Sequence, residues 1–185
     1  ISAWVLSTAV RRADGGEDGY DCIPNGMALA KNVLTVGAVE DVLDYGGPDS
    51  VRMTSFSSWG PADDGRIKPD ISGNGLELFS SLSENDQDYG IYSGTSMASP
   101  NVCGSLALLQ SRYIELRGRP MEAATLKALA LGTASEAGPG PGPDYAFGWG
   151  LLDTWAAYTL IESDPDGRRG AIAEFTLHEG RTQEF

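Results

Sequence analysis

The 185-residue chain is poor in basic side chains and has no long hydrophobic run. It carries 13 lysine and arginine residues against 26 aspartate and glutamate residues, which gives a formal net charge of -13 at pH 7. A negative field of this size argues against nucleic acid and anionic membrane surfaces as partners. No apolar run approaches the ~20 residues that a membrane-spanning helix needs. We therefore expect neither a nucleic-acid-binding protein nor a membrane protein.

Cysteine and histidine are also scarce. The two cysteines, Cys22 and Cys103, are too few for a disulfide framework and lack the spacing of a metal site. We interpret both as unpaired, with Cys103 a small buried side chain on a helix, and a disulfide between them is the alternative. The single histidine, His178, lies in the tail "TLHEGRTQEF". The chain starts on an apolar run without Met, and we expect neither end to be a natural terminus. No segment resembles a signal peptide, and for that reason this absence excludes nothing.

Short apolar runs separated by polar, glycine-rich stretches predict a layered α/β fold. The run at 32–39, "NVLTVGAV", is bounded by polar residues and fits a strand that is covered on both faces of a parallel sheet. The segment 60–75 is dense in turn residues and is predicted to be an ordered loop. Further strands are expected at 1–8, 53–58, 76–82 and 89–92.

Three helices are expected, and all lie in the later part of the chain. Their clustering there indicates that the chain contains only the later half of such a fold. The first is predicted by apolar residues with the period of one helical face, and Gly118 and Pro120 end it. A second helix is expected over 121–131, with Pro120 in its first turn, and a third from a cap at Asp153 to residue 161. The apolar positions of the first helix are Val102, Leu106, Leu109, Tyr113 and Leu116.

A domain boundary is expected after residue 163, where the stretch "DPDGRRG" begins. Residues 1–163 are then one domain. Residues 164–185 are interpreted as a linker and the first strand of a following β module, because "AIAEFTL" at 171–177 alternates like a strand.

Ser96 lies where an extended run meets a helix. The run ends at residues 92–94, and an apolar helix begins within a few residues. The unpaired N–H groups and positive dipole end of a helix amino terminus suit a developing oxyanion. Pro100 is expected in the first turn, where a missing N–H costs nothing. Ser96 is therefore a candidate nucleophile, and the alternative is a helix cap.

The segment 94–100, "GTSMASP", resembles the nucleophile motif of subtilisin-like serine peptidases, the subtilases. It differs from the Gly-x-Ser-x-Gly elbow of α/β-hydrolases, since residue 98 is Ala. Three more blocks are similar to that family: "KNVLTVGAVED", "TSFSSWGPADDGRIKPDISGNG" and "GPDYAFGWGLLDTWAAYTLI". Together the blocks extend over residues 31–161.

The resemblance implies the C-terminal portion of a three-layer, parallel-sheet α/β peptidase domain. Ser96 would be the acylating nucleophile, its own N–H would donate to the oxyanion, and Thr95 would support that hole. The family's catalytic Asp and His precede the serine, so both are expected upstream of this chain. The resemblance thus implies a fragment of a serine endopeptidase that needs the missing N-terminal part of its domain. It also implies a peptide or protein substrate, a secreted protein, no cofactor for the chemistry, and structural calcium as an option.

The family's second oxyanion donor is an Asn in an "AAGN"-like turn, and this chain departs from that pattern. The corresponding region is "VLSTAVRRADGG", where Val10 and Arg11 fall near the expected Gly-Asn. The loop could be altered, residues could be missing, or the register could differ by a few positions. Another departure is Asn101, where many members have His, but that position is outside the triad.

Two other functions are open. One is a pseudopeptidase or binding module with an altered oxyanion turn. The other is an unrelated α/β hydrolase whose serine is served by His178. Two acidic clusters could offer oxygen ligands to calcium, although neither has a recognised spacing, and we interpret both as solvated loops without a metal. They comprise Asp14, Glu17, Asp18 and Asp21, and Asp63, Asp64 and Asp70.

Overall fold

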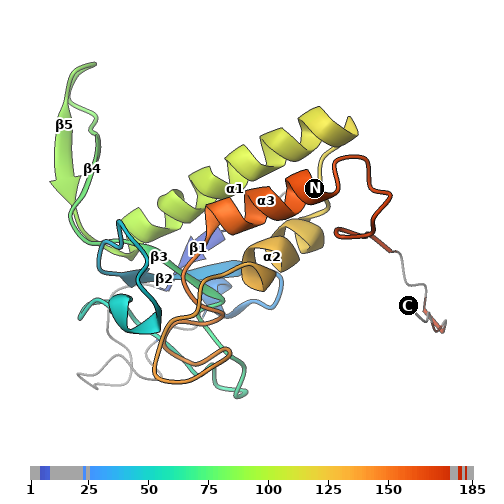
Figure 1. The fold of residues 1–185 in the computed structure, drawn as a ribbon. Coiled ribbons are helices and arrows are strands. Elements are labelled where there is room, and N and C mark those ends of the chain that lie inside the picture. Colours follow the sequence, from blue (N-terminus) through green and yellow to red (C-terminus); the bar gives the residue numbers. More distant parts are fainter. Residues whose placement is uncertain (1–4, 9–22, 24–25, 176–178, 181, 183–185) are drawn as a thin grey trace.

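A computed structural model describes residues 5–8, 23, 26–175, 179–180 and 182, and the expected α/β arrangement is confirmed there. Three parallel strands form a sheet in the order β1-β2-β3, and two antiparallel strands, β4 and β5, form a separate hairpin (Figure 1). The strands are β1 (Val5–Ser7), β2 (Leu34–Val39), β3 (Ile71–Asn74), β4 (Leu78–Ser81) and β5 (Tyr89–Tyr92), and the helices are α1 (Thr95–Arg117), α2 (Ala123–Gly132) and α3 (Thr154–Ser163). Short 3-10 turns occur at Met27–Leu29 and Pro48–Ser50.

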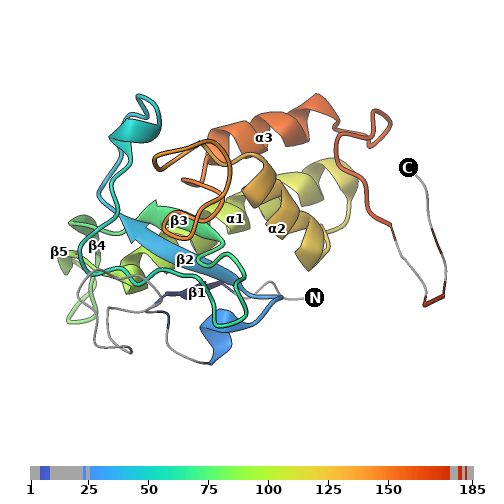
Figure 2. The same cartoon turned by 90° about the horizontal axis from the view of Figure 1, so that it is seen from below.

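The core lies between the sheet and α1. Every residue of β2 is buried, which explains its continuous apolar sequence. The apolar face predicted for α1 packs on the sheet, with Val102, Leu109 and Tyr113 almost fully buried. α2 and α3 lie together at the end of the molecule opposite the β4–β5 hairpin (Figure 2). No helix in the described part of the chain is long and apolar enough to cross a membrane.

The three predicted helices are present, with small shifts at their ends. Gly118 ends α1 in the left-handed conformation (φ 69°), and its N–H donates to the Ile114 carbonyl. α2 starts at Ala123, so Pro120 precedes the helix and does not occupy its first turn. The Asp153 carboxylate caps α3 by accepting a 2.8 Å hydrogen bond from the Ala156 N–H.

The strand expected at 53–58 is absent. Met53 makes an isolated bridge to Val39, and the chain then turns. Side chains bind this segment to β2, because Thr54 Oγ1 donates to the Ala38 carbonyl and Ser57 Oγ accepts from the Ala38 N–H. Conversely, the predicted loop 60–75 contains β3, a mostly buried strand that pairs with β2. Its glycine and polar residues are not typical of a strand, so the sequence did not predict it. Strands β1, β2, β4 and β5 fall within their predicted ranges.

Cys103 is exposed, so its predicted burial is wrong. It follows Val102 on α1, and the 100° turn between consecutive residues carries it away from the face that contacts the sheet. Cys22 lies outside the described residues.

The segment after α3 packs back on the helices. Asp164 is fully buried and accepts hydrogen bonds from the N–H groups of Arg169 and Ala171. Ile172 packs against the core, and Glu174 accepts from the Glu122 N–H. Residues 171–175 form no strand, so the strand expected at 171–177 is absent from its described part. A following β module stays a prediction.

Candidate active site around Ser96

Ser96 is the second residue of α1, directly after the turn that leaves the β4–β5 hairpin. Gly94 is the N-cap residue, with φ 155°, and its carbonyl accepts hydrogen bonds from the N–H groups of Met97 and Ala98. No side chain caps the helix. The interpretation of Ser96 as a capping residue is therefore wrong, because Ser96 lies inside the first turn.

The helix start is tied to the end of β3. The Gly94 N–H donates a 2.8 Å hydrogen bond to the carbonyl of Gly75. A Cβ atom at Gly75 would lie 2.7 Å from the Ala38 Cβ and 3.0 Å from the Gly94 carbonyl oxygen. Glycine at position 75 therefore lets β2, β3 and the first turn of α1 approach closely, and this approach fixes the position of Ser96.

Ser96 is exposed, whereas its neighbour Thr95 is buried. No described residue accepts a hydrogen bond from the Ser96 N–H, which belongs to the unpaired donors of a helix amino terminus. The positive end of the helix dipole acts at the same place. This N–H is therefore available to an anionic oxygen.

Pro100 lies in the second turn of α1, not in the first as expected. Position 100 is four residues after Ser96, where an N–H would normally donate to the Ser96 carbonyl. Proline has no such donor, so the Ser96 carbonyl lacks this helical hydrogen bond.

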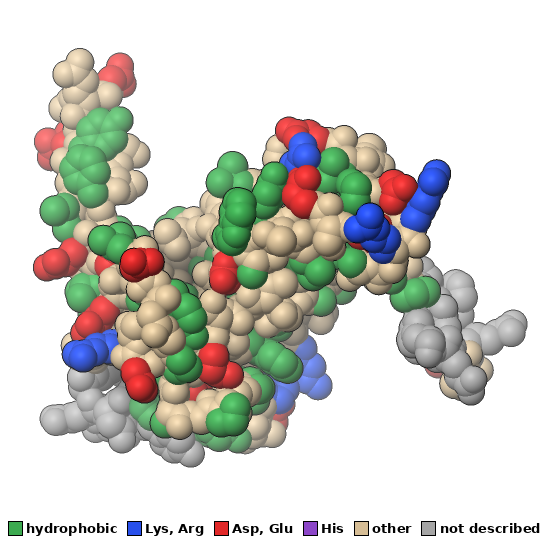
Figure 3. All heavy atoms as spheres, in the orientation of Figure 1, with side chains coloured by type: hydrophobic (Ala, Val, Ile, Leu, Met, Phe, Trp, Pro, Cys, Tyr) green, Lys and Arg blue, Asp and Glu red, His purple; other side chains and the backbone are tan. Residues whose placement is uncertain are grey.

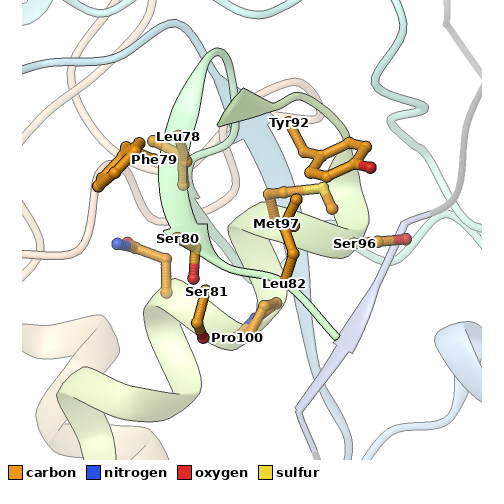
Figure 4. A pocket seen from close by; sticks show the side chains of 10 residues that line it. Leu78, Phe79, Ser80, Ser81, Leu82, Tyr92, Ser96, Met97 and Pro100 are labelled. Carbon is orange, nitrogen blue, oxygen red and sulfur yellow. The ribbon is translucent and has the colours of Figure 1, made fainter. Parts of the chain in front are cut away.

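A cavity of about 350 Å³ extends from Ser96 along strand β4. Ser96 is at one end, and its hydroxyl points away from the Leu78 and Ser80 side chains (Figure 4). The sequence predicted the strand at 76–82 but not its position next to the start of α1. The lining residues are Leu78, Phe79, Ser80, Ser81, Leu82, Tyr92, Ser96, Met97, Pro100 and Asn101.

A base for Ser96 is absent from the described residues, which contain no histidine. His178 lies outside them, as do Val10 and Arg11, the positions matched to the second oxyanion donor. The exposed Asn101 lies on α1 and lines the same cavity as Ser96.

The second acidic cluster does not form one site. Asp70 is buried, and its carboxylate binds Lys68 Nζ at 2.6 Å and Lys127 Nζ at 2.9 Å. Burial lowers the pKa of Lys68, against the opposing effect of Asp70. Asp64 is exposed and pairs with Arg66, whose hydrogen bond lowers the pKa of the Asp64 carboxyl. Asp70 is thus part of an internal ion network apart from Asp64. The first acidic cluster, at 14–21, lies outside the described residues.

The chain is similar in sequence to known peptidases. The sequence model of the subtilase family matches residues 24–150. C5a peptidase of Streptococcus pyogenes serotype M3 is 40% identical over 84 residues, which are 45% of this chain and 7% of that protein. Subtilase-type proteinase RRT12 of Saccharomyces cerevisiae is 37% identical over 103 residues, which are 56% of this chain and 18% of that protein.

A solved protease has a similar structure. Patellamide maturation protease PatA superposes with a TM-score of 0.62 and 27% sequence identity, over 86% of this chain and 51% of that chain. The partial, parallel-sheet α/β fold expected from the sequence is confirmed by this likeness. The chain spans about half the length of that protease and less than a fifth of each of the two sequence relatives.

Proposed function

The chain belongs to the subtilase family of peptidases, and on that premise we propose that it carries the nucleophile of a serine endopeptidase, Ser96. The observation that supports this role is the position of Ser96, exposed at the amino terminus of α1 beside a cavity, with its own N–H unpaired among the described residues. The catalytic Asp and His are assigned to a segment that precedes this chain.

The proposed reaction is acyl transfer. Ser96 Oγ attacks the carbonyl carbon of a peptide bond while a histidine takes its proton, and a carboxylate orients that histidine. The carbonyl oxygen becomes an oxyanion, to which the Ser96 N–H donates in the favourable field of the helix terminus. Collapse of the tetrahedral intermediate breaks the C–N bond, the amine leaves with the histidine's proton, and water then hydrolyses the acyl-enzyme.

Thr95 supports the reaction by position and not by contact with substrate. It is buried, and it joins the cap residue Gly94 to Ser96. The chemistry needs no cofactor in this proposal, and calcium would act only on the fold. The substrate is a peptide or protein, and the site of action is proposed to be outside the cell.

The test is a peptide-hydrolysis assay on two proteins: the 185-residue chain and the product of the complete reading frame. We expect turnover from the second and none from the first, because a serine without a base is a weak nucleophile. Robust turnover by the 185-residue chain would overturn the assignment of the base to another segment. A complete product that folds but does not hydrolyse peptides would favour a pseudopeptidase.

A further inference from the structure

The β4–β5 hairpin projects from the body of the molecule (Figure 1). Three large apolar side chains are exposed on one face of it. Phe79 is 70% exposed, Tyr89 56% and Ile91 63%. Phe79 is opposite Ile91 in the strand register, and the rings of Phe79 and Tyr89 stack with centroids 5.6 Å apart. We call these three residues the hairpin face. The described part of the chain leaves it open to solvent.

The other side of the hairpin faces the nucleophile. Leu78 and Tyr92 are paired in the register and both line the Ser96 cavity, as does Leu82. Phe79 also lines this cavity, so the hairpin face adjoins the active site. Tyr89 and Ile91 are not among the lining residues, and no step of the proposed reaction uses them. Its attachment is fixed, because β5 ends at Tyr92 and the Gly94 N–H is bound to Gly75.

The charge around the hairpin is of one sign. Residues 69–111 contain no lysine or arginine, although they contain five acidic residues. Glu84 and Asp86 are exposed in the turn between β4 and β5, and Glu77 is exposed at the base of β4. Figure 3 shows acidic and apolar side chains on the hairpin and no basic ones. The net charge of -13 extends the same sign to the whole chain.

We propose that the hairpin face binds a cationic segment of the polypeptide substrate that carries apolar side chains, next to the Ser96 cavity. Arginine and lysine can stack on the exposed Phe79 and Tyr89 rings while the acidic turn attracts their charge. Apolar side chains of the same segment would cover Ile91. The identification of this segment as part of a substrate rests on the proposed function. The binding itself rests on the residues of the hairpin alone.

The interface is small, so weak and salt-dependent binding is expected. The probe is a short fluorescein-labelled peptide that alternates arginine with leucine, and its control replaces each arginine with glutamate. Fluorescence anisotropy with the 185-residue chain should detect the arginine peptide only. Raising the salt concentration should weaken this binding, because part of it is electrostatic.

Three variants test the residues. The double variant Phe79→Ser/Tyr89→Ser should weaken binding by about tenfold or more, because buried aromatic side chains carry most of the energy of such contacts. Glu84→Gln/Asp86→Asn should weaken it less and reduce its salt dependence. Trp155→Ser is the matched control, because Trp155 is 75% exposed on α3 and is not part of the hairpin. This variant should bind the peptide as the unmodified chain does. Thermal melting of each variant confirms that it folds.

Several results would overturn the proposal. One is unchanged binding in the Phe79→Ser/Tyr89→Ser variant, and another is equal binding of the glutamate peptide. A third is a dimer in sedimentation that this double variant abolishes, since a second copy would then cover the face. Binding by a Ser96→Ala chain should equal that of the unmodified chain. If binding persists while the complete protein hydrolyses nothing, the proposed function fails and the binding site stands.

Discussion

The N–H of Gly94 and the carbonyl of Gly75 are joined by a 2.8 Å hydrogen bond that holds the start of α1 against the end of β3. Ser96 is two residues beyond Gly94, so its position depends on this contact. The hydrogen bond connects the strand order of the sheet to the geometry of the candidate site.

Replacing Gly75 with alanine should destabilise the chain. The new methyl group would meet the Ala38 Cβ at 2.7 Å and the Gly94 carbonyl at 3.0 Å, and overpacking of this kind costs about 1–3 kcal/mol. Urea unfolding monitored by circular dichroism measures the loss. The control is Gly104→Ala on α1, where nothing lies within 4 Å and alanine should stabilise the helix by about 0.5–1 kcal/mol. Equal stability of Gly75→Ala and the unmodified chain would contradict the close approach.

The ion network at Asp70 should be essential to the fold. Asp70→Asn removes the counter-charge of Lys68, which is only 2% exposed, and loss of one partner from a buried pair costs about 3–5 kcal/mol. The same urea experiment measures this loss. The matched control is Asp64→Asn, which breaks an exposed pair with Arg66 and should leave stability nearly unchanged. Similar small effects of both variants would show that the network is solvated.

The attachment of the C-terminal segment should depend on pH. Hydrogen bonds from the Arg169 N–H, followed by that of Ala171, hold the pKa of Asp164 below its ordinary value of 3.8. A lowered carboxyl pKa stabilises the folded state above the ordinary pKa, and that stabilisation is lost as the pH falls through the lowered value. The difference in Tm between the unmodified chain and Asp164→Asn should therefore be constant near neutral pH and shrink at acidic pH below 3.8.

Thermal melting across this pH range tests the prediction, with Asp166→Asn as the control. Asp166 is an exposed neighbour, and its substitution should change the Tm little at any pH. A Tm difference for Asp164→Asn that does not shrink in acid would show that the buried carboxylate does not act through its charge.

Local patterns in the sequence were sufficient for much of the fold. The helical period of α1, the cap at Asp153 and the buried run of β2 each depend on residues close together in the chain, and all three are present in the structure. The position of Ser96 at the start of a helix was predicted for the same reason.

Features set by distant residues were missed. β3 is short and contains Ser72 and Gly73, so only its pairing with β2 makes it a strand. Burial of Asp70 depends on Lys68 and on Lys127, which is 57 residues away, and no local pattern marks that pair. The prediction that Cys103 is buried is wrong for a local reason. The buried residues of α1 recur three or four positions apart, and Cys103 lies between two of them, Val102 and Leu106.

The most direct test of the central claim is the identity of the residue that a fluorophosphonate probe modifies in the product of the complete reading frame. The account predicts a phosphonyl adduct on Ser96, found by mass spectrometry of the digested protein, and no adduct in its Ser96→Ala variant or in the 185-residue chain alone. An adduct on another serine, or peptide hydrolysis that survives Ser96→Ala, would contradict the assignment of Ser96 as the nucleophile.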